Sequence, residues 1–259
     1  MRVLILGAGP AGLTAARTLR ELAPSRSIDP AITMVSAEST PPYSPPAMAD
    51  YFLTGREATL YWQGKDVCDR LRVDFCAGSA VEAVYPGQRQ ALLTDGSYLD
   101  YDRLIIATGS RLHAPLEGYE LPGVYNFKSL EAARLLVESV KAGDTNSALI
   151  VGAGFIGVEV AVLLNELGCN VTIIDKLWLM PSILDEETAE LVLNDLRNRG
   201  IVVHQYTEAL RFSGNARVKG VELENGETLV ADAYIAATGI KPNVAFLEGS
   251  GLDIGWGIR

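Results

Sequence analysis

Two segments of this chain, far apart in the sequence, begin in the same way. Residues 1–12 read MRVLILGAGPAG and residues 147–158 read SALIVGAGFIGV, so in each an apolar run leads into G-A-G-x-x-G. A second pair is longer: residues 95–109, DGSYLDYDRLIIATG, align without gaps with residues 225–239, NGETLVADAYIAATG. A duplicated unit of this kind changes the number of domains that the chain is expected to form. The chain is predicted to contain two similar halves, each ending in an Ala-Thr-Gly strand.

The apolar periodicity predicts that each half begins with a strand, a helix and a second strand. A strand, helix and strand in alternation indicate an α/β class with a doubly wound parallel sheet. The predicted elements are 2–6, about 11–22 and 31–36 in the first half, and 148–151, about 155–167, 170–174 and about 185–199 in the second.

Turn signals divide the rest of each half. Asp-Gly at 95–96 and Asn-Gly at 225–226 lie between alternating apolar residues. Such pairs predict hairpins with type I′ turns, in which both central residues have positive φ. Residues 111–125 are rich in Pro and Gly and are expected to connect the two halves.

Each glycine-rich loop follows a strand and opens a helix, which is the context in which G-x-G-x-x-G binds a dinucleotide. The first glycine allows a tight turn, the second lets a pyrophosphate approach the backbone, and the third lets the helix pack closely. The helix N-terminus adds free N–H groups and a positive dipole end. One such loop could be an ordinary turn, but two in matched contexts favour two dinucleotide sites. The glycines are Gly7, Gly9 and Gly12, then Gly152, Gly154 and Gly157.

An acidic residue at the end of the second strand of each half is expected to accept hydrogen bonds from a ribose. Asp175 directly follows the strand 170–174. In the first half the strand ends in Ser36, and the first carboxylate is Glu38, two residues later. Glu38 is therefore the candidate in that half, with a solvated loop acid as the alternative.

The composition argues against several classes of partner. The 259 residues are 48% hydrophobic and carry a net charge of -10, with no basic block, so nucleic acid and anionic membranes are not expected partners. No apolar run reaches the roughly 18 residues needed to span a bilayer. Three cysteines form neither a CxxC pair nor a metal-site spacing, and the two histidines lie far apart. We therefore expect a cytoplasmic protein without a metal site.

With both loops, both Ala-Thr-Gly strands and ATGIKPN at 237–243 in place, the chain resembles the pyridine nucleotide-disulfide oxidoreductase superfamily. Within it, the sequence is most similar to the NADH-dependent ferredoxin and rubredoxin reductases, the NADH oxidases and the NADH-binding part of nitrite reductases. The resemblance implies two Rossmann-like domains, with the NAD domain inserted in the FAD domain. It implies an FAD-binding domain at 1–111, an NAD(H)-binding domain at 112–240, and the start of an incomplete return to the FAD domain at 241–259.

The resemblance also implies roles for single residues. On the FAD side, the expected cofactor-binding residues are Gly7, Gly9, Pro10, Ala11 and Gly12 at the pyrophosphate, Glu38 at the ribose, Val81 at the adenine, and Thr108 and Gly109 along the flavin. On the NAD side they are Gly152, Gly154, Phe155, Ile156 and Gly157 at the pyrophosphate, Asp175 at the ribose, and Gly239 in the second Ala-Thr-Gly. Glu159 matches a glutamate near the nicotinamide and is the expected catalytic residue, with a helix-surface acid as the alternative.

The sequence departs from the family in three places. The redox cysteines of the disulfide reductases and of related oxidases are absent, including the position near Pro46 or Ala47, so no redox-active disulfide is expected. Two basic residues of the ferredoxin-reductase branch are replaced by Pro45 and Asp50, so the acceptor does not follow by analogy. The chain ends at Arg259, before a Gly-Asp motif and an interface domain, and is expected to be C-terminally truncated, with a homodimer expected only if that domain is present.

The implied function is that of an FAD-dependent NAD(P)H oxidoreductase that prefers NADH. Hydride would pass from NADH to FAD, and electrons from the flavin to an unidentified acceptor, which could be a small redox protein. The alternative from another class is a nucleotide-binding redox sensor, or a partner-dependent subunit without turnover of its own.

Overall fold

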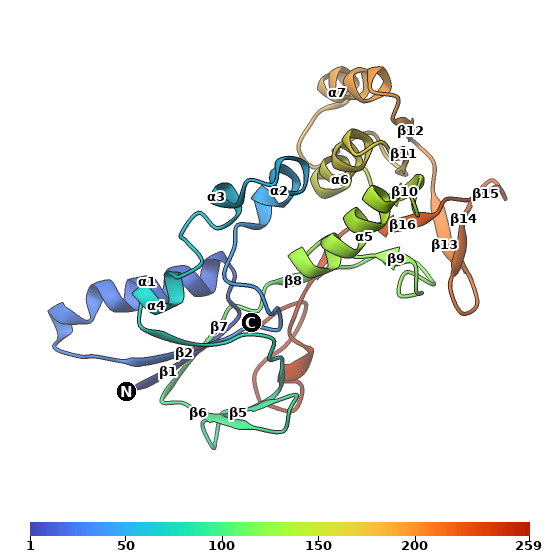
Figure 1. Ribbon diagram of the computed structural model, residues 1–259. Coiled ribbons are helices and arrows are strands. Elements are labelled where there is room, and N and C mark those ends of the chain that lie inside the picture. Colours follow the sequence, from blue (N-terminus) through green and yellow to red (C-terminus); the bar gives the residue numbers. More distant parts are fainter. The chain divides into compact units, whose positions relative to one another are not determined.

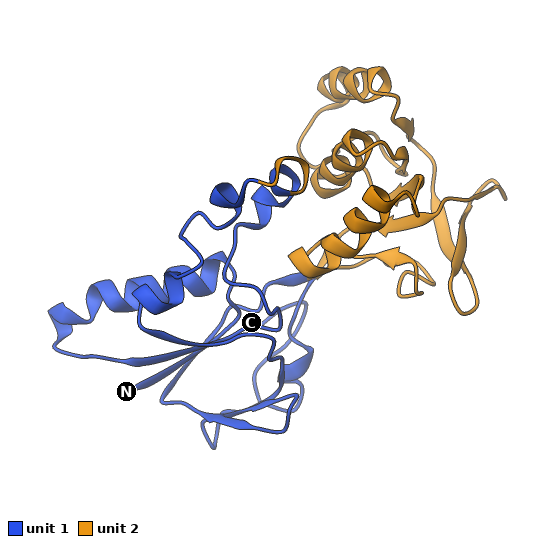
Figure 2. Ribbon diagram, in the orientation of Figure 1, with its two compact units in different colours: residues 1–51, 56–110, 241–259 blue, residues 52–55, 111–240 orange.

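The computed structural model describes residues 1–259 and shows a mixed α/β chain (Figure 1). The chain divides into two compact units (Figure 2). Unit 1 comprises Met1–Tyr51, Arg56–Ser110 and Lys241–Arg259, and unit 2 comprises Phe52–Gly55 and Arg111–Ile240. The predicted class, α/β with parallel sheets, is confirmed.

A parallel four-stranded sheet with the order β3-β2-β1-β7 forms the centre of unit 1. Helix α1 (Pro10–Leu22) connects β1 to β2 and buries Gly12, Leu13 and Ala16. Because β1 lies between β2 and β7, the loop after β1 meets the end of the Ala-Thr-Gly strand. The strands are β1 (Arg2–Leu6), β2 (Ala31–Val35), β3 (Val73–Cys76) and β7 (Arg103–Ile106).

The remaining elements of unit 1 are short. An antiparallel sheet consists of β4 (Val81–Tyr85), β5 (Gln90–Leu93) and β6 (Tyr98–Asp100). The 3-10 helix η3 (Ala245–Leu247) returns to this unit, where Leu247 is buried beside Leu4 and Val84. The other short helices are η1 (Pro24–Arg26), η2 (Pro45–Ala47), α2 (Met48–Thr54), α3 (Glu57–Leu60) and α4 (Val67–Arg70), and the end of α2 from Phe52 onward belongs to unit 2.

Unit 2 repeats this plan with one more strand. Its parallel sheet has the order β12-β11-β10-β16-β9, and a three-stranded antiparallel sheet has the order β13-β14-β15. The parallel strands are β9 (Val124–Tyr125), β10 (Ser147–Val151), β11 (Asn170–Ile174), β12 (Val202–His204) and β16 (Ala233–Ala236). The helices are α5 (Leu130–Ala142), α6 (Phe155–Glu166) and α7 (Glu186–Asn198), and the antiparallel strands are β13 (Ala209–Gly214), β14 (Val218–Leu223) and β15 (Thr228–Leu229). Strands β8 (Ser110–Leu112) and β17 (Ile240–Pro242) form a separate pair.

The two hairpins form where they were expected, but the predicted turn type is wrong. Only the glycines, Gly96 and Gly226, have positive φ, at 85° and 84°. Asp95 accepts a hydrogen bond from the Ser97 amide, and Asn225 accepts one from the Glu227 amide. Each side chain therefore bonds its own backbone two residues on, which supports a turn with one left-handed residue instead of two.

The segment 111–125, which was expected to connect the halves, follows the boundary between the units and also packs as a part of unit 2. Ala114 is fully buried in the core of unit 2, beside Leu149 and Phe212. The Phe212 amide donates to the carbonyl of Glu117, and Val124–Tyr125 forms the edge strand β9 beside β16. This Pro- and Gly-rich segment is a part of the second unit.

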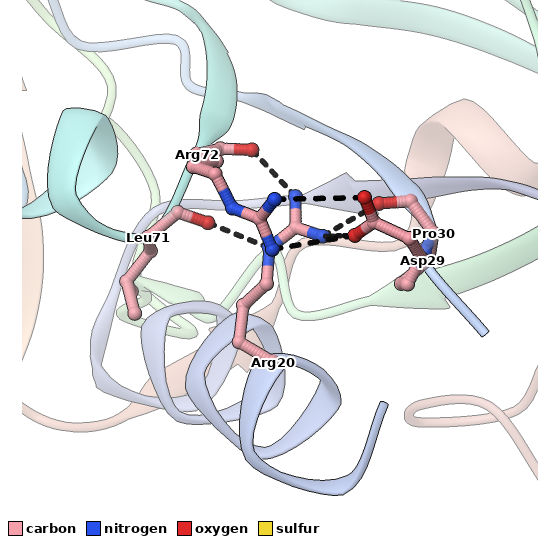
Figure 3. Close-up of polar contacts among 5 residues, drawn as sticks. All are labelled: Arg20, Asp29, Pro30, Leu71 and Arg72. Carbon is pink, nitrogen blue, oxygen red and sulfur yellow. Dashed lines mark hydrogen bonds and ion pairs between the residues drawn. The ribbon is translucent and has the colours of Figure 1, made fainter. Parts of the chain in front are cut away.

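A single arginine joins three chain segments of unit 1 (Figure 3). The guanidinium of Arg20, at the end of α1, donates to the carbonyls of Leu71 (2.7 Å), Arg72 (2.6 Å) and Pro30 (2.7 Å) and pairs with Asp29 at 3.0 Å. Its side chain is only 12% exposed. Burial lowers the pKa of Arg20, the nearby Arg72 lowers it further, and Asp29 opposes both.

We predict that Arg20→Ala destabilises unit 1 by about 2 to 4 kcal/mol, because three carbonyls, two of them in part-buried hydrogen bonds, lose a charged donor. Arg20→Lys should recover only a part of this, since one ammonium cannot span three carbonyls as a planar fork does. Urea unfolding followed by circular dichroism measures both. Arg26→Ala removes an exposed arginine nearby and is the matched control. Equal midpoints for Arg20→Ala and Arg26→Ala would contradict the assignment.

Candidate functional site

The first glycine of each loop lies against the backbone of the Ala-Thr-Gly strand of the same unit. Gly7 has φ +104°, and a Cβ on it would lie 2.2 Å from the carbonyl oxygen of Ala107. Gly152 has φ +111°, and a Cβ there would lie 2.5 Å from the carbonyl oxygen of Ala237. A side chain is excluded at both positions by conformation and by space.

The third glycine of each loop lets a helix touch the turn that precedes it. A Cβ on Gly12 would lie 2.0 Å from the carbonyl oxygen of Gly7, and one on Gly157 would lie 2.0 Å from that of Gly152. Both contacts are with backbone, which cannot rotate away. These glycines are therefore required by packing within the protein itself.

The second glycine of each loop is different, because nothing lies within 4 Å of a Cβ built on Gly9 or Gly154. Both residues are N-caps in the extended region, with φ of -70° and -74°, which any residue adopts. The fold itself therefore gives no reason for glycine at either position. The open space in front of each loop fits a group that must approach the backbone closely.

The helices behind these loops also begin without side-chain caps. Ser129 caps α5 and Asp185 caps α7, each by accepting a hydrogen bond from a backbone amide. No side chain does this for α1 or α6, and neither has an acidic residue in its first turn. Because uncapped N–H groups and the positive dipole end attract anions, both helix N-termini fit phosphate groups.

Asp175 ties the second loop to the end of β11. Its Oδ2 accepts from the Ala153 amide at 2.7 Å and its Oδ1 from the Leu177 amide at 2.9 Å. The carbonyl of Ala153 in turn accepts from the Met180 amide at 2.9 Å. The residue between two loop glycines is thus held on both sides by the segment that follows β11. Asp175 lies beside the loop as the sequence pattern implied, with lone pairs left for a further donor.

In unit 1 the corresponding carboxylate is held differently. Ser36 follows β2 and is 9% exposed, and its hydroxyl accepts from the Glu38 amide at 3.2 Å. The hydroxyl of Tyr43 lies 3.0 Å from both carboxylate oxygens of Glu38. Tyr43 belongs to the Pro-rich loop and was not among the expected site residues.

Each Ala-Thr-Gly segment is fastened to a part of its unit that lies far away in the sequence. Thr108 donates from its hydroxyl to the carbonyl of Asn243 at 2.8 Å, and the Asn243 side chain donates back to the Thr108 carbonyl at 2.9 Å. In unit 2 the Thr238 hydroxyl donates to the carbonyl of His113 at 3.2 Å, and the His113 amide donates to Gly239 at 2.9 Å. Asn243, in ATGIKPN, thus holds Thr108 in place.

Glu159 lies on α6, five residues after the helix N-cap. It is half-buried. Burial raises the pKa of Glu159, and the positive charge of Lys128 opposes that shift.

The other expected residues lie on the same loops and strands. Pro10 and Ala11 begin α1, and Phe155 and Ile156 begin α6. Phe155 is 62% exposed. Val81 is the first residue of β4.

None of the three cysteines belongs to a glycine-rich loop. Cys68 and Cys169 are buried, Cys76 is half-buried, and all three are free thiols. Burial, together with a smaller contribution from a nearby carboxylate, raises the pKa of Cys68 and of Cys169 to about 11. These thiols stay protonated, and hence weakly nucleophilic, at neutral pH.

The position that carries a lysine in the ferredoxin-reductase branch belongs to a surface pair here. Asp50 Oδ1 lies 2.6 Å from Arg56 Nη2, and Oδ2 accepts from the Thr59 hydroxyl at 2.9 Å. The hydrogen bonds from Arg56 and Thr59 lower the pKa of Asp50. No helix in the structure is both long enough and apolar enough to cross a membrane.

Comparison with known proteins gives a single family. The profile of the family described as pyridine nucleotide-disulphide oxidoreductase matches residues 1–258. The chain is 29% identical to the NADH-dependent phenylglyoxylate dehydrogenase subunit epsilon of Aromatoleum evansii, over 99% of its own length. It is 30% identical to the ferredoxin--NAD(+) reductase component of an anthranilate 1,2-dioxygenase system from Burkholderia cepacia, again over 99%. A solved NAD-dependent persulfide reductase from A. fulgidus superimposes on 98% of the chain with a TM-score of 0.85 and 30% identity.

These relatives are longer than the chain. The chain spans 60% of the first, 63% of the second and 49% of the solved structure.

Proposed function

Because the chain belongs to the pyridine nucleotide-disulphide oxidoreductase family, we propose that it is a flavoprotein oxidoreductase that takes hydride from NADH and passes electrons to a separate acceptor. Unit 1 holds FAD and unit 2 holds NADH, as two Rossmann-like domains with the second inserted in the first. Bound FAD supplies the hydride-accepting and electron-donating chemistry, and the protein supplies position and electrostatics.

The observation that carries this proposal is the contrast among the three glycines of each loop. The first and third are forced by the fold, whereas Gly9 and Gly154 face open space at an uncapped helix N-terminus. This arrangement occurs once in each unit. Two pyrophosphate sites in one chain fit one flavin dinucleotide and one nicotinamide dinucleotide.

The chain's own groups have separate tasks in this proposal. The amides at the starts of α1 and α6 bind phosphate, and Glu38 and Asp175 accept from ribose hydroxyls. Val81 contacts the adenine of FAD, Thr108 and Gly109 lie along the flavin, and Gly239 has the matching place in unit 2. Glu159 orients the nicotinamide ring.

The acceptor in this proposal is a small redox protein. The Burkholderia relative is named as a ferredoxin--NAD(+) reductase component. The second candidate is an electron-transfer subunit that depends on a partner enzyme. It is favoured by the Aromatoleum relative and by a relative from Bacillus subtilis, which are named as subunits of larger enzymes.

An anaerobic titration tests the proposal. The purified protein should show a flavin absorbance spectrum, and NADH should bleach it. Bleaching with turnover of added ferredoxin supports the reductase, and bleaching without turnover by the isolated chain supports the partner-dependent subunit. Protein that binds neither FAD nor NADH would refute both.

We predict that NADH reduces the flavin at least about tenfold faster than NADPH at equal subsaturating concentration. Asp175 would accept from the ribose hydroxyl of NADH and repel a 2′-phosphate, and no arginine lies between 175 and 196. Stopped-flow reduction with the two cofactors measures the ratio. Equal or faster reduction by NADPH would be the contrary result.

We predict that Glu159→Ala slows hydride transfer by one to two orders of magnitude, about 1.4 to 2.7 kcal/mol of lost positioning, with FAD still bound. Since burial raises the pKa of Glu159, its charge and its positioning role should be lost at a higher pH than for an ordinary glutamate. The rate should therefore fall on acidification, and Glu159→Gln should flatten that part of the pH profile.

The free energy of unfolding should change with pH in the opposite direction to the rate of hydride transfer. Because the pKa is raised in the folded state, ionisation of Glu159 costs stability as the pH rises through that pKa. Glu159→Gln should therefore unfold no more easily than the parent at pH 7, although it reacts more slowly. Glu166→Gln, at the far end of α6, is the control. An unchanged single-turnover rate in Glu159→Ala would leave Glu159 as a helix-surface acid.

A further inference from the structure

The segment after β11 carries one positive charge in an acidic neighbourhood. Lys176 directly follows Asp175 and is the only basic residue between 176 and 196. The same stretch contains five carboxylates: Asp185, Glu186, Glu187, Glu190 and Asp195. Lys176 is therefore the one cation there that could receive an additional phosphate.

Lys176 already has an anionic neighbour from another part of unit 2. Its ammonium lies 4.0 Å from Oε1 of Glu208, and the two side chains are 66% and 48% exposed. Glu208 lies in the loop between β12 and β13, so this pair joins two loops at the same end of the parallel sheet.

Backbone hydrogen bonds fix these two loops against each other. The Asp175 amide donates to the carbonyl of His204, and the Thr207 amide donates back to the carbonyl of Asp175 at 2.9 Å. The Tyr206 amide donates to the carbonyl of Leu177. Because bonds on both sides of Lys176 tie its segment to 204–207, Glu208 stays next to Lys176.

We propose that Glu208 is a specificity-determining residue that acts against NADPH through Lys176. This inference rests on the proposed binding of the nicotinamide dinucleotide at Gly152–Gly157 and Asp175. A 2′-phosphate on the ribose held by Asp175 would need a cation, and Lys176 is the one at hand. Glu208 neutralises that cation. The favourable contact between Lys176 and a 2′-phosphate is thus weakened, in addition to the repulsion that Asp175 itself exerts.

An equilibrium measurement tests this without any redox step. Dissociation constants for NAD+ and NADP+ are measured by calorimetry for the full chain and for Glu208→Gln at low ionic strength, where exposed charges are least screened. We expect Glu208→Gln to improve the affinity for NADP+ relative to NAD+ by about three- to tenfold, the scale of one exposed contact between a lysine and a phosphate. The side chain is half-exposed, and the bond from the Glu224 amide to the Glu208 carbonyl involves backbone only, so the variant should fold.

A double-mutant cycle separates the route through Lys176 from direct repulsion. In a Lys176→Ala background, Glu208→Gln should give little or no gain for NADP+. Glu166→Gln is the matched control, because it removes one charge from an ion pair with Arg199 (2.8 Å) at the opposite end of α6. It should leave the ratio of the two affinities unchanged.

Each outcome of these affinity measurements either supports or overturns the role proposed for Glu208. An unchanged ratio in Glu208→Gln overturns the inference, and so does an equal gain with and without Lys176. A gain of the same size in Glu166→Gln would show a general effect of net charge and would also overturn it. If the parent chain binds NAD+ normally in these cases, the proposed function stands while the inference fails. If the parent binds neither dinucleotide, the proposed site itself is wrong.

Discussion

Gly157→Ala should leave unit 2 largely unfolded at 25 °C, and Gly12→Ala should do the same to unit 1. In each case the added Cβ would lie 2.0 Å from a backbone carbonyl oxygen of the loop that precedes the helix. The helix cannot retreat freely, because a retreat would uncover the buried face that carries Gly157: Val160, Ala161 and Leu164 follow at helical spacing and are buried as well. Overlap between two rigid backbones in a close-packed interior costs about 4 kcal/mol or more, a large fraction of the stability of a domain.

Circular dichroism and urea unfolding of the purified variants measure this effect. Gly143→Ala is a useful comparison, because Gly143 has φ +79° at the end of α5 with nothing near its Cβ position. That variant carries conformational strain alone, about 1 kcal/mol. If Gly157→Ala unfolds at the same urea concentration as Gly143→Ala, the close approach of α6 to its loop is not what requires glycine.

Gly154→Ala should have the opposite profile: a fold that is intact or slightly more stable, and NADH binding that is weakened by about a hundredfold. Its φ of -74° suits alanine, and no atom lies within 4 Å of the new Cβ. Replacing glycine at a compatible position reduces the entropy of the unfolded chain and stabilises by about 0.4 to 1 kcal/mol. The same methyl group would occupy the space into which a pyrophosphate must come, which costs about 2.7 kcal/mol for a hundredfold loss.

Calorimetric titration with NAD+ and a thermal melt of the same sample test both halves of this prediction. Gly9→Ala provides the parallel case in unit 1, with FAD content as the measurement. The melt should show an unchanged or raised Tm in the absence of added nucleotide. A Gly154→Ala protein that binds NAD+ as tightly as the parent would remove the main support for the proposed site.

Much of the fold could be predicted from local sequence, because the strands and helices around each loop have strong apolar periods. The predicted helix of about 155–167 is observed as Phe155–Glu166, and the strand 170–174 is observed as Asn170–Ile174. The predicted turn type was wrong because a side chain competes with the backbone for hydrogen bonds: Asp95 and Asn225 each accept one from the backbone amide two residues ahead. The packing of 111–125 in the core of unit 2 could not be predicted, because composition does not report the burial of Ala114.

The candidate site was predictable to the extent that its chemistry lies in the loop motifs. The glycines, Asp175 and Glu38 could be named because spacing along the chain determines them. The contact between Tyr43 and Glu38, the bonds from Asn243 to Thr108 and the pairing of Lys176 with Glu208 could not be named. Each depends on how two loops without periodic sequence approach each other in space.

The bond between the Asp175 carboxylate and the Ala153 amide has a consequence for how such a protein can change its preferred nucleotide. In this chain, the group expected to select between nucleotides also supports the phosphate loop. A substitution of Asp175 would therefore loosen the loop that every dinucleotide needs, and affinity for the new nucleotide would start from a weakened site. In unit 1 the corresponding position is Ser36. The first carboxylate there is that of Glu38, two residues later, and it accepts a hydrogen bond from the Tyr43 hydroxyl. A change of preference that begins at Asp175 would thus need at least two substitutions in unit 2, with the compensating one near Ala153 or Met180. A single Asp175→Asn protein that kept its full melting temperature and bound both nucleotides well would show that the shorter route is open.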